Sequence, residues 1–194
     1  MSKEIYGYIS VIFALLSMLP YMLTVHKGQT KPHLFTWVIW AIPTAVVFMG
    51  QLSSKAGAGA WASGFTLLCN ILIVFQSFKY ADKNITRSDW FYFIGGLSAI
   101  PLWIIAKDPL YSIILSTIID VIAYGPTVRK SWNKPYDENV ITYIMCPPKH
   151  VFALLAMQNY SLVNIIFPCA MIVVNTTMYV YLVIRRRQIG KPAE

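Results

Sequence analysis

The chain has 194 residues, of which 57% are hydrophobic and only 12% are charged. Soluble domains carry about 25% charged residues, so this composition excludes an ordinary soluble domain and indicates a membrane protein. The formal net charge of +8 could suggest a nucleic-acid-binding protein, but the basic residues lie in short loops between long apolar runs. That distribution indicates membrane topology, and no nucleic-acid partner is expected.

Seven apolar runs are long enough to cross a bilayer core, which needs about 20 residues of helix. Lipid offers no partners to backbone polar groups, so each run is predicted to be α-helical. The first run is too long for the apolar region of a signal peptide and has no small-residue cleavage site, so we expect it in the mature protein. In chain order, the predicted spans are 4–25, 34–53, 58–78, 89–106, 110–128, 139–157 and 160–184.

Lysine and arginine counts predict the orientation of these spans. Three of these residues fall in the loops on one side of the membrane, twelve fall on the other side, and Lys149 lies within a span. Because cytoplasmic loops are enriched in basic residues, we expect the N-terminus outside and the C-terminus in the cytoplasm. The protein is then integral to a plasma or inner membrane.

A basic loop recurs about a hundred residues along the chain. T-V-H-K-G-Q-T-K-P-H at 24–33 aligns without a gap with T-V-R-K-S-W-N-K-P-Y at 127–136 and shares five residues with it. Prolines flank both copies: Pro20, Pro43, Pro126 and Pro147. This repetition predicts an internal duplication. One extra span between the copies makes them run in the same direction, so we expect two parallel three-helix bundles joined by a linker helix. The predicted divisions are 1–78, the linker 79–109, 110–187 and a cytoplasmic tail 188–194.

This pattern resembles the SWEET and PQ-loop transporter superfamily, in a three-plus-one-plus-three arrangement with the N-terminus outside. The matching positions are the prolines Pro20, Pro43, Pro126 and Pro147 and the asparagines Asn70 and Asn175. The basic loop after the first proline is also similar to the K-K-S-T type loop of those families. The Pro-Gln dipeptide is absent, since Tyr21 follows Pro20 and Thr127 follows Pro126. The resemblance implies an all-α polytopic fold, transport of a small polar solute and a hinge role for the four prolines.

Three uncharged residues are candidates for binding the solute. Asn70 and Asn175 form a pseudo-symmetric pair, and an amide offers donors and an acceptor to a polar solute. The alternative for both is a hydrogen bond between helices, worth about 0.6 kcal/mol on average. Trp40 is deep enough to stack on a ligand ring. Tryptophans at membrane boundaries usually anchor the protein there, and we expect this of Trp37 and of the tryptophans at 61, 90, 103 and 132.

Three charged or titratable residues lie within predicted spans. Asp120 lies midway along its span, where a carboxylate costs about 2.5–3.5 kcal/mol on insertion scales. Lys149 and His150 reach a similar depth in a span that runs the opposite way, so either residue could pair with Asp120. We expect a protonatable gate or a contact to a charged solute group, with a structural ion pair as the alternative. The resemblance adds that proton-coupled PQ-loop members use an acidic helix residue.

The sequence therefore predicts a small secondary carrier, with proton coupling left open. Its solute is expected to be a sugar, an amino acid or a vitamin precursor, and the alternative function is a membrane receptor or assembly factor. We expect no enzymatic activity, metal or cofactor, because the chain shows no nucleophile–base or metal-ligand pattern. The cysteines at 69, 146 and 169 lie in apolar runs and are expected to be packing residues. Homo-oligomerisation is left open.

Overall fold

The computed structural model describes residues 2–28, 32, 34–80, 90, 93–94, 97–98, 101, 108–133, 135–138 and 140–190. The described residues form helices and turns, with no strand among them. Apart from a few single positions and pairs, the predicted linker span 89–106 lies outside the described residues.

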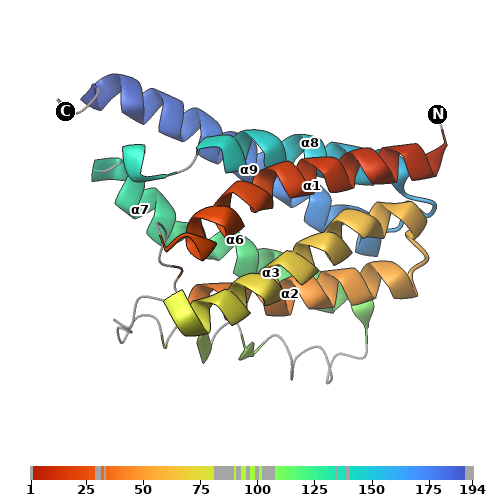
Figure 1. Cartoon of the computed structure of the whole chain (residues 1–194). Helices are drawn as coiled ribbons and strands as arrows, with labels where there is room; N and C mark the ends of the chain where they lie inside the picture. The colour runs from red at the N-terminus through yellow and green to blue at the C-terminus, as the bar shows by residue number, and fades with distance from the viewer. Residues whose placement is uncertain are drawn as a thin grey trace.

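The first half of the molecule, residues 3–80, contains three long helices (Figure 1). These are α1 (Lys3–His26), α2 (Leu34–Ser53) and α3 (Trp61–Tyr80), and the short 3-10 helix η1 (Gly57–Ala60) leads directly into α3. Their bounds agree with the predicted spans to within three residues at each end. Long apolar runs form helices here because each segment must satisfy its own backbone polar groups.

The second half, residues 109–189, contains α6 (Pro109–Ile122), α7 (Gly125–Asn133), η2 (Pro135–Asp137), α8 (Val140–Ala156) and α9 (Leu162–Ile189). Its first helix begins at Asp108, whose carboxylate oxygen Oδ1 accepts a hydrogen bond of 2.8 Å from the backbone nitrogen of Leu110. A side chain that accepts from the first turn in this way fixes the start of a helix.

The predicted single span 110–128 is wrong in one respect, because the helix breaks at Ala123 and Tyr124. Pro126 lies in the first turn of α7, whereas we expected it inside a continuous helix. Proline lacks a backbone N–H, and its ring clashes with the carbonyl four residues earlier in a helix interior, so the first turn accommodates it better.

Within the described part of the chain, four helical segments are long and apolar enough to cross a membrane: Lys3–His26, Gly57–Tyr80, Pro109–Asn133 and Leu162–Ile189. The helices α2 and α8 are shorter but also apolar. Large apolar side chains on the surface, such as Tyr8, Phe75, Ile122 and Val173, are more than half exposed. An exposed apolar surface of this kind suits contact with lipid and agrees with an integral membrane protein.

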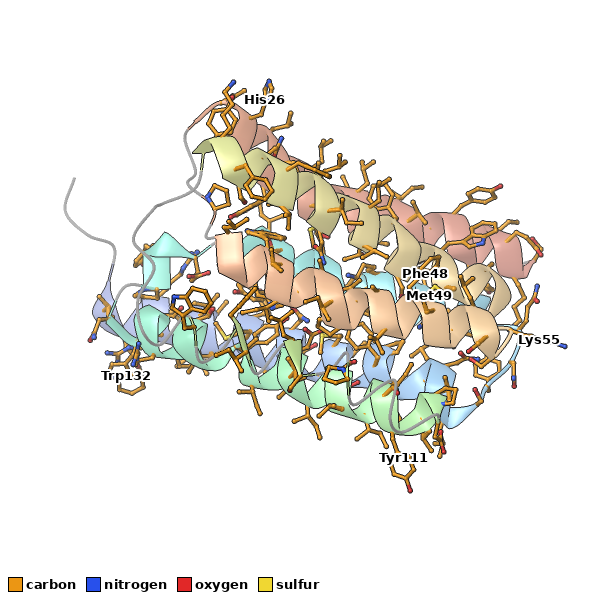
Figure 2. All side chains as sticks on the ribbon, turned by 90° about the horizontal axis from the view of Figure 1, so that it is seen from below. His26, Phe48, Met49, Lys55, Tyr111 and Trp132 are labelled. Atoms are coloured by element: carbon orange, nitrogen blue, oxygen red, sulfur yellow. The ribbon has the colours of Figure 1, made fainter. Side chains whose placement is uncertain are left out.

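The six long helical segments pack as a closed ring. The helix α1 contacts α3 and α8, α2 contacts α3 and α6, and α9 contacts α6 and α8. At its centre, Val47, Ile113, Phe167 and Met171 form an apolar cluster between α2, α6 and α9. We call the end where α1 begins the N-terminal end and the end where α9 finishes the C-terminal end (Figure 1). Figure 2 shows His26 and Trp132 at the C-terminal end and Lys55 and Tyr111 toward the other.

Candidate functional site

A cavity of about 160 Å³ lies inside the ring, with side chains from both halves in its wall. An engineered protein cavity of about 150 Å³ is large enough to hold benzene, so this one can hold a solute of a few non-hydrogen atoms. All the predicted solute-binding and charged residues line it: Trp40, Asn70, Asp120, Lys149, His150 and Asn175. The structure thus brings together six residues that are far apart in sequence.

Asp120 lies at the end of a polar stripe on α6. Asp108, Ser112, Ser116 and Asp120 follow one another at intervals of four residues, which places them on one face of the helix. Ser112, Ser116 and Asp120 are all buried, so this face points into the ring. The side chain of Asp120 is only 7% exposed, and among the described residues its oxygen Oδ1 has no hydrogen-bond partner.

Lys149 and His150 reach the same cavity from α8, where they are 5% and 4% exposed. Neither forms an ion pair with Asp120, since no nitrogen of these two side chains lies within 4.0 Å of its carboxylate oxygens in the part of the chain that the structure describes. The ring of His150 instead packs edge-on against Phe167, with 5.7 Å between the ring centroids. The direct pairing that the sequence left open is therefore not formed with either partner.

The two predicted asparagines have different surroundings. Asn70 on α3 donates from Nδ2 to Oγ1 of Thr44 at 3.2 Å, and within the described residues its side-chain oxygen accepts no hydrogen bond. Asn175 on α9 uses both ends of its amide: Oδ1 accepts from the Tyr124 hydroxyl at 3.1 Å, and Nδ2 donates to the Met171 carbonyl at 2.8 Å. Both residues link helices and line the cavity, so their two predicted roles are compatible.

An aromatic wall, formed by Tyr21, Trp37 and Trp40, closes one side of the cavity. The Trp37 and Trp40 rings meet edge to face with 5.2 Å between centroids, and Trp37 Nε1 donates to the Tyr21 hydroxyl at 3.2 Å. We expected Trp37 at the membrane boundary, but it is only 6% exposed. Trp37 and Trp40 are three residues apart on α2 and so share a helix face, which here points inward. Their spacing was the signal that could have identified Trp37.

Of the predicted hinge prolines, Pro20, Pro43 and Pro147 do not line the cavity but lie beside residues that do. Pro20 precedes Tyr21 in α1, and Pro147 lies two residues before Lys149 in α8. Pro43 lies within α2 next to Thr44, which also lines the cavity. Pro168 in α9 has a similar position next to Phe167 and was missed, since the repeat pattern did not include it. Their hinge role stays a prediction.

Among the described residues, no group of His, Cys, Asp and Glu is close enough to hold a metal ion. The three cysteines are free thiols. Comparison with protein-family models, with curated proteins and with solved structures finds no match to this chain.

Proposed function

We propose that this protein is a membrane carrier for a small polar solute, built from two three-helix repeats and a linker span and working by alternating access. One observation carries this proposal. The cavity between the halves gathers the buried carboxylate of Asp120, the ammonium of Lys149 and the amides of Asn70 and Asn175 inside helices apolar enough to cross a membrane. Ionisable residues buried within a membrane usually mark a solute or ion pathway.

The repeated packing of the halves supports the three-plus-one-plus-three arrangement. In the first half α3 packs against both α1 and α2, and in the second half α9 packs against both α6 and α8. The third helix thus lies between the other two in each half. Across the ring, α1 meets α8 and α2 meets α6, so the first helix of each half meets the second helix of the other. This reciprocal packing is what a pseudo-twofold axis between two parallel repeats produces.

A set of hydrogen bonds joins the two halves at the N-terminal end of the bundle. We call this set the N-terminal seal: residues 54–56 after α2, Gln158 and Asn159 between α8 and α9, and Asn164 in the first turn of α9. The backbone nitrogen of Gln158 donates to the Ala56 carbonyl at 3.0 Å, and Asn159 Nδ2 donates to the Ser54 carbonyl at 2.9 Å. Asn164 also bonds the hydroxyl of Ser54 and is fully buried. If the N-terminal end faces outside, as the basic loops predict, a carrier must break this seal to admit a solute from outside.

A reversible cross-link across the seal tests the proposal. Ala56→Cys and Gln158→Cys, introduced after replacing the three native cysteines with serine, would place two thiols on residues whose backbones are already hydrogen-bonded. Neighbours at that separation fit the Cα–Cα range of a disulfide, about 4.4–6.8 Å. In proteoliposomes, uptake of labelled glucose, L-alanine and uridine would be measured before and after oxidation.

We expect at least one of these solutes to enter, oxidation to abolish its entry, and dithiothreitol to restore it. The single variants Ala56→Cys and Gln158→Cys are the controls and should be insensitive to oxidation. Undiminished uptake by protein that is fully cross-linked would contradict alternating access. Binding without passage of any of the three solutes would instead favour the receptor or assembly factor.

A further inference from the structure

The cavity contains one acidic and one basic side chain whose charges interact but which form no ion pair with each other in the described structure. Asp120 and Lys149 are both more than nine-tenths buried and both line the cavity. Asp120 Oδ1 has no hydrogen-bond partner, and no ion pair joins the two side chains in the described structure. A buried charge without a partner is costly, and truncating one member of a buried pair is strongly destabilising for the same reason. The two groups form no ion pair with each other, so a solute that bears both counter-charges can pair with each of them.

The remaining groups in the described cavity wall supply no counter-charge, although Cys146 forms a side-chain hydrogen bond with Lys149. The titratable side chains that line it besides Asp120 and Lys149 are Tyr21, Tyr124, Cys146, Tyr143 and His150. None of them is a carboxylate, a lysine or an arginine, so the described wall has one formal negative and one formal positive charge. A simple anion would leave Asp120 unpaired, a simple cation would leave Lys149 unpaired, and a neutral sugar would leave both unpaired.

The positions of Asp120 and Lys149 on the ring of helices bear on which solute can pair with both. Asp120 lies on α6 and Lys149 on α8, and these helices pack on either side of α9. Asp120 and Lys149 therefore reach the cavity from two different helices. The aromatic wall of Tyr21, Trp37 and Trp40 comes from the first half of the chain. Such a wall suits an apolar side chain or the face of an ammonium group, through cation–π attraction.

We propose that the solute is a zwitterion of the size of a small α-amino acid, with its ammonium group at Asp120, its carboxylate at Lys149 and its side chain against the aromatic wall. This assignment rests on the proposed carrier function and chooses among the solute classes that the sequence left open. A net-neutral solute with separated charges pairs both buried groups at once. Asp120 then disfavours solutes without a positive charge, and Lys149 disfavours solutes without a negative charge.

Matched solutes test the assignment by binding to the purified full-length protein at pH 7. Glycine, L-alanine and L-proline are each compared with an amide that keeps only the positive charge and an acid that keeps only the negative one. The amides are glycinamide, L-alaninamide and L-prolinamide, and the acids are glycolate, L-lactate and tetrahydrofuran-2-carboxylate. We expect at least one zwitterion to bind at least about tenfold more tightly than both of its analogues, measured by isothermal titration calorimetry. Equal binding of an analogue, preference for glucose or uridine, or no binding of any of the three zwitterions would overturn the assignment.

Two near-isosteric variants separate recognition from a structural role. Asp120→Asn should lose at least tenfold in affinity for the zwitterion and shift the preference to the anionic analogue, which needs only Lys149. Lys149→Gln should shift the preference the opposite way, toward the amide. Glu4→Gln, which removes an exposed carboxylate outside the cavity wall, should keep the zwitterion preference. Weaker binding without a change of preference in both charge variants would overturn the assignment. So would an Asp120→Asn protein that keeps the zwitterion preference and loses only the pH dependence of flux.

The flux measurement keeps this assignment distinct from the carrier proposal. A protein that passes glucose or uridine but not amino acids is a carrier for which the zwitterion assignment fails. A protein that binds the zwitterions with the expected preference, but passes none of them, keeps the assignment and fails as a carrier.

Discussion

At the N-terminal end of the bundle, hydrogen bonds join the two halves of the molecule, while at the C-terminal end they join parts of the second half. The seal bonds residues 54–56 to Gln158, Asn159 and Asn164, and Lys3 Nζ adds hydrogen bonds to the Leu155 carbonyl and the Tyr160 hydroxyl. In the described chain, the hydrogen bonds between the halves are found at this end. Hydrogen bonds at the N-terminal end thus hold the two halves together.

At the C-terminal end, α9 holds the segment between α6 and α8. Tyr181 donates to the Val128 carbonyl at 3.0 Å, and Arg185 Nε donates to the Trp132 carbonyl at 2.7 Å. Arg186 donates to the carbonyls of Pro135 and Glu138 at 3.0 and 2.7 Å. The guanidinium of Arg185 also lies 4.0 Å from the centroid of the Trp132 ring. These contacts hold the segment between α6 and α8 against α9.

Two glycines, one near each end of the bundle, also differ in how closely other residues pack around them. A Cβ atom on Gly59, near the seal, would lie 2.4 Å from Met157 Cγ and 3.0 Å from the Ala153 carbonyl oxygen. A Cβ atom on Gly125, at the start of α7, would meet nothing within 4 Å. Of these two glycines, only Gly59 lies where the backbones of the two halves approach closely. If the two halves rotate against each other, the halves would separate at the seal. At the C-terminal end, the second half would then move as one body.

The largest effect is expected from a substitution that disrupts the close approach of η1 and α8 at the seal. Gly59→Val inserts a branched side chain against the backbone of α8 and should destabilise the protein by about 3 kcal/mol, the upper part of the range for overpacking. Gly125→Ala is the matched change at the open position and should stay within about 0.5 kcal/mol of wild type. Thermal unfolding of both variants in detergent measures the difference. Equal melting temperatures would show that the two ends are packed alike.

A smaller effect is expected from removing one polar group of the seal. Asn164 is fully buried, donates to the Asn159 carbonyl at 2.8 Å and bonds Ser54 through Oδ1. Asn164→Ala should cost about 2 kcal/mol, because it leaves buried partners without a hydrogen bond. Asn159→Ala, at an exposed residue with one side-chain bond to the Ser54 carbonyl, serves as the control. Chemical denaturation of the two variants should show the larger loss for Asn164, and the reverse order would mean that the buried amide contributes little to the seal.

The smallest effect concerns the C-terminal end. Arg186→Lys keeps the positive charge but loses the forked donors to Pro135 and Glu138, and should cost about 1 kcal/mol. Hydrogen exchange at residues 135–138 should accelerate, while exchange at the seal should not change. Arg187→Lys, at an exposed neighbour, is the control. Faster exchange at the seal in Arg186→Lys would show that the two ends are coupled, contrary to the separation described above.

Much of the architecture follows from local properties of the sequence. The bounds of α2 are those predicted, because a long apolar run must bond its own backbone in lipid. The candidate residues at 70, 120, 149, 150 and 175 were also identifiable, since polar groups within such runs are rare. The helix break before Pro126 was not predicted, although proline at a first turn is a known local signal. The predicted last span ended at residue 184, whereas α9 continues through Arg185–Arg187 to Ile189.

The sequence by itself determined that the chain is helical and apolar enough for a membrane, and which of its residues were unusual there. These are consequences of hydropathy and helix periodicity, which depend on neighbouring residues. Only the tertiary structure decided that Trp37 is buried, that Asp120 has no ion-pair partner within the described part of the chain, and that Asn164 links the two halves. Each of these depends on how α6 to α9 close the ring against α1 to α3, since contacts between segments about a hundred residues apart leave no local pattern.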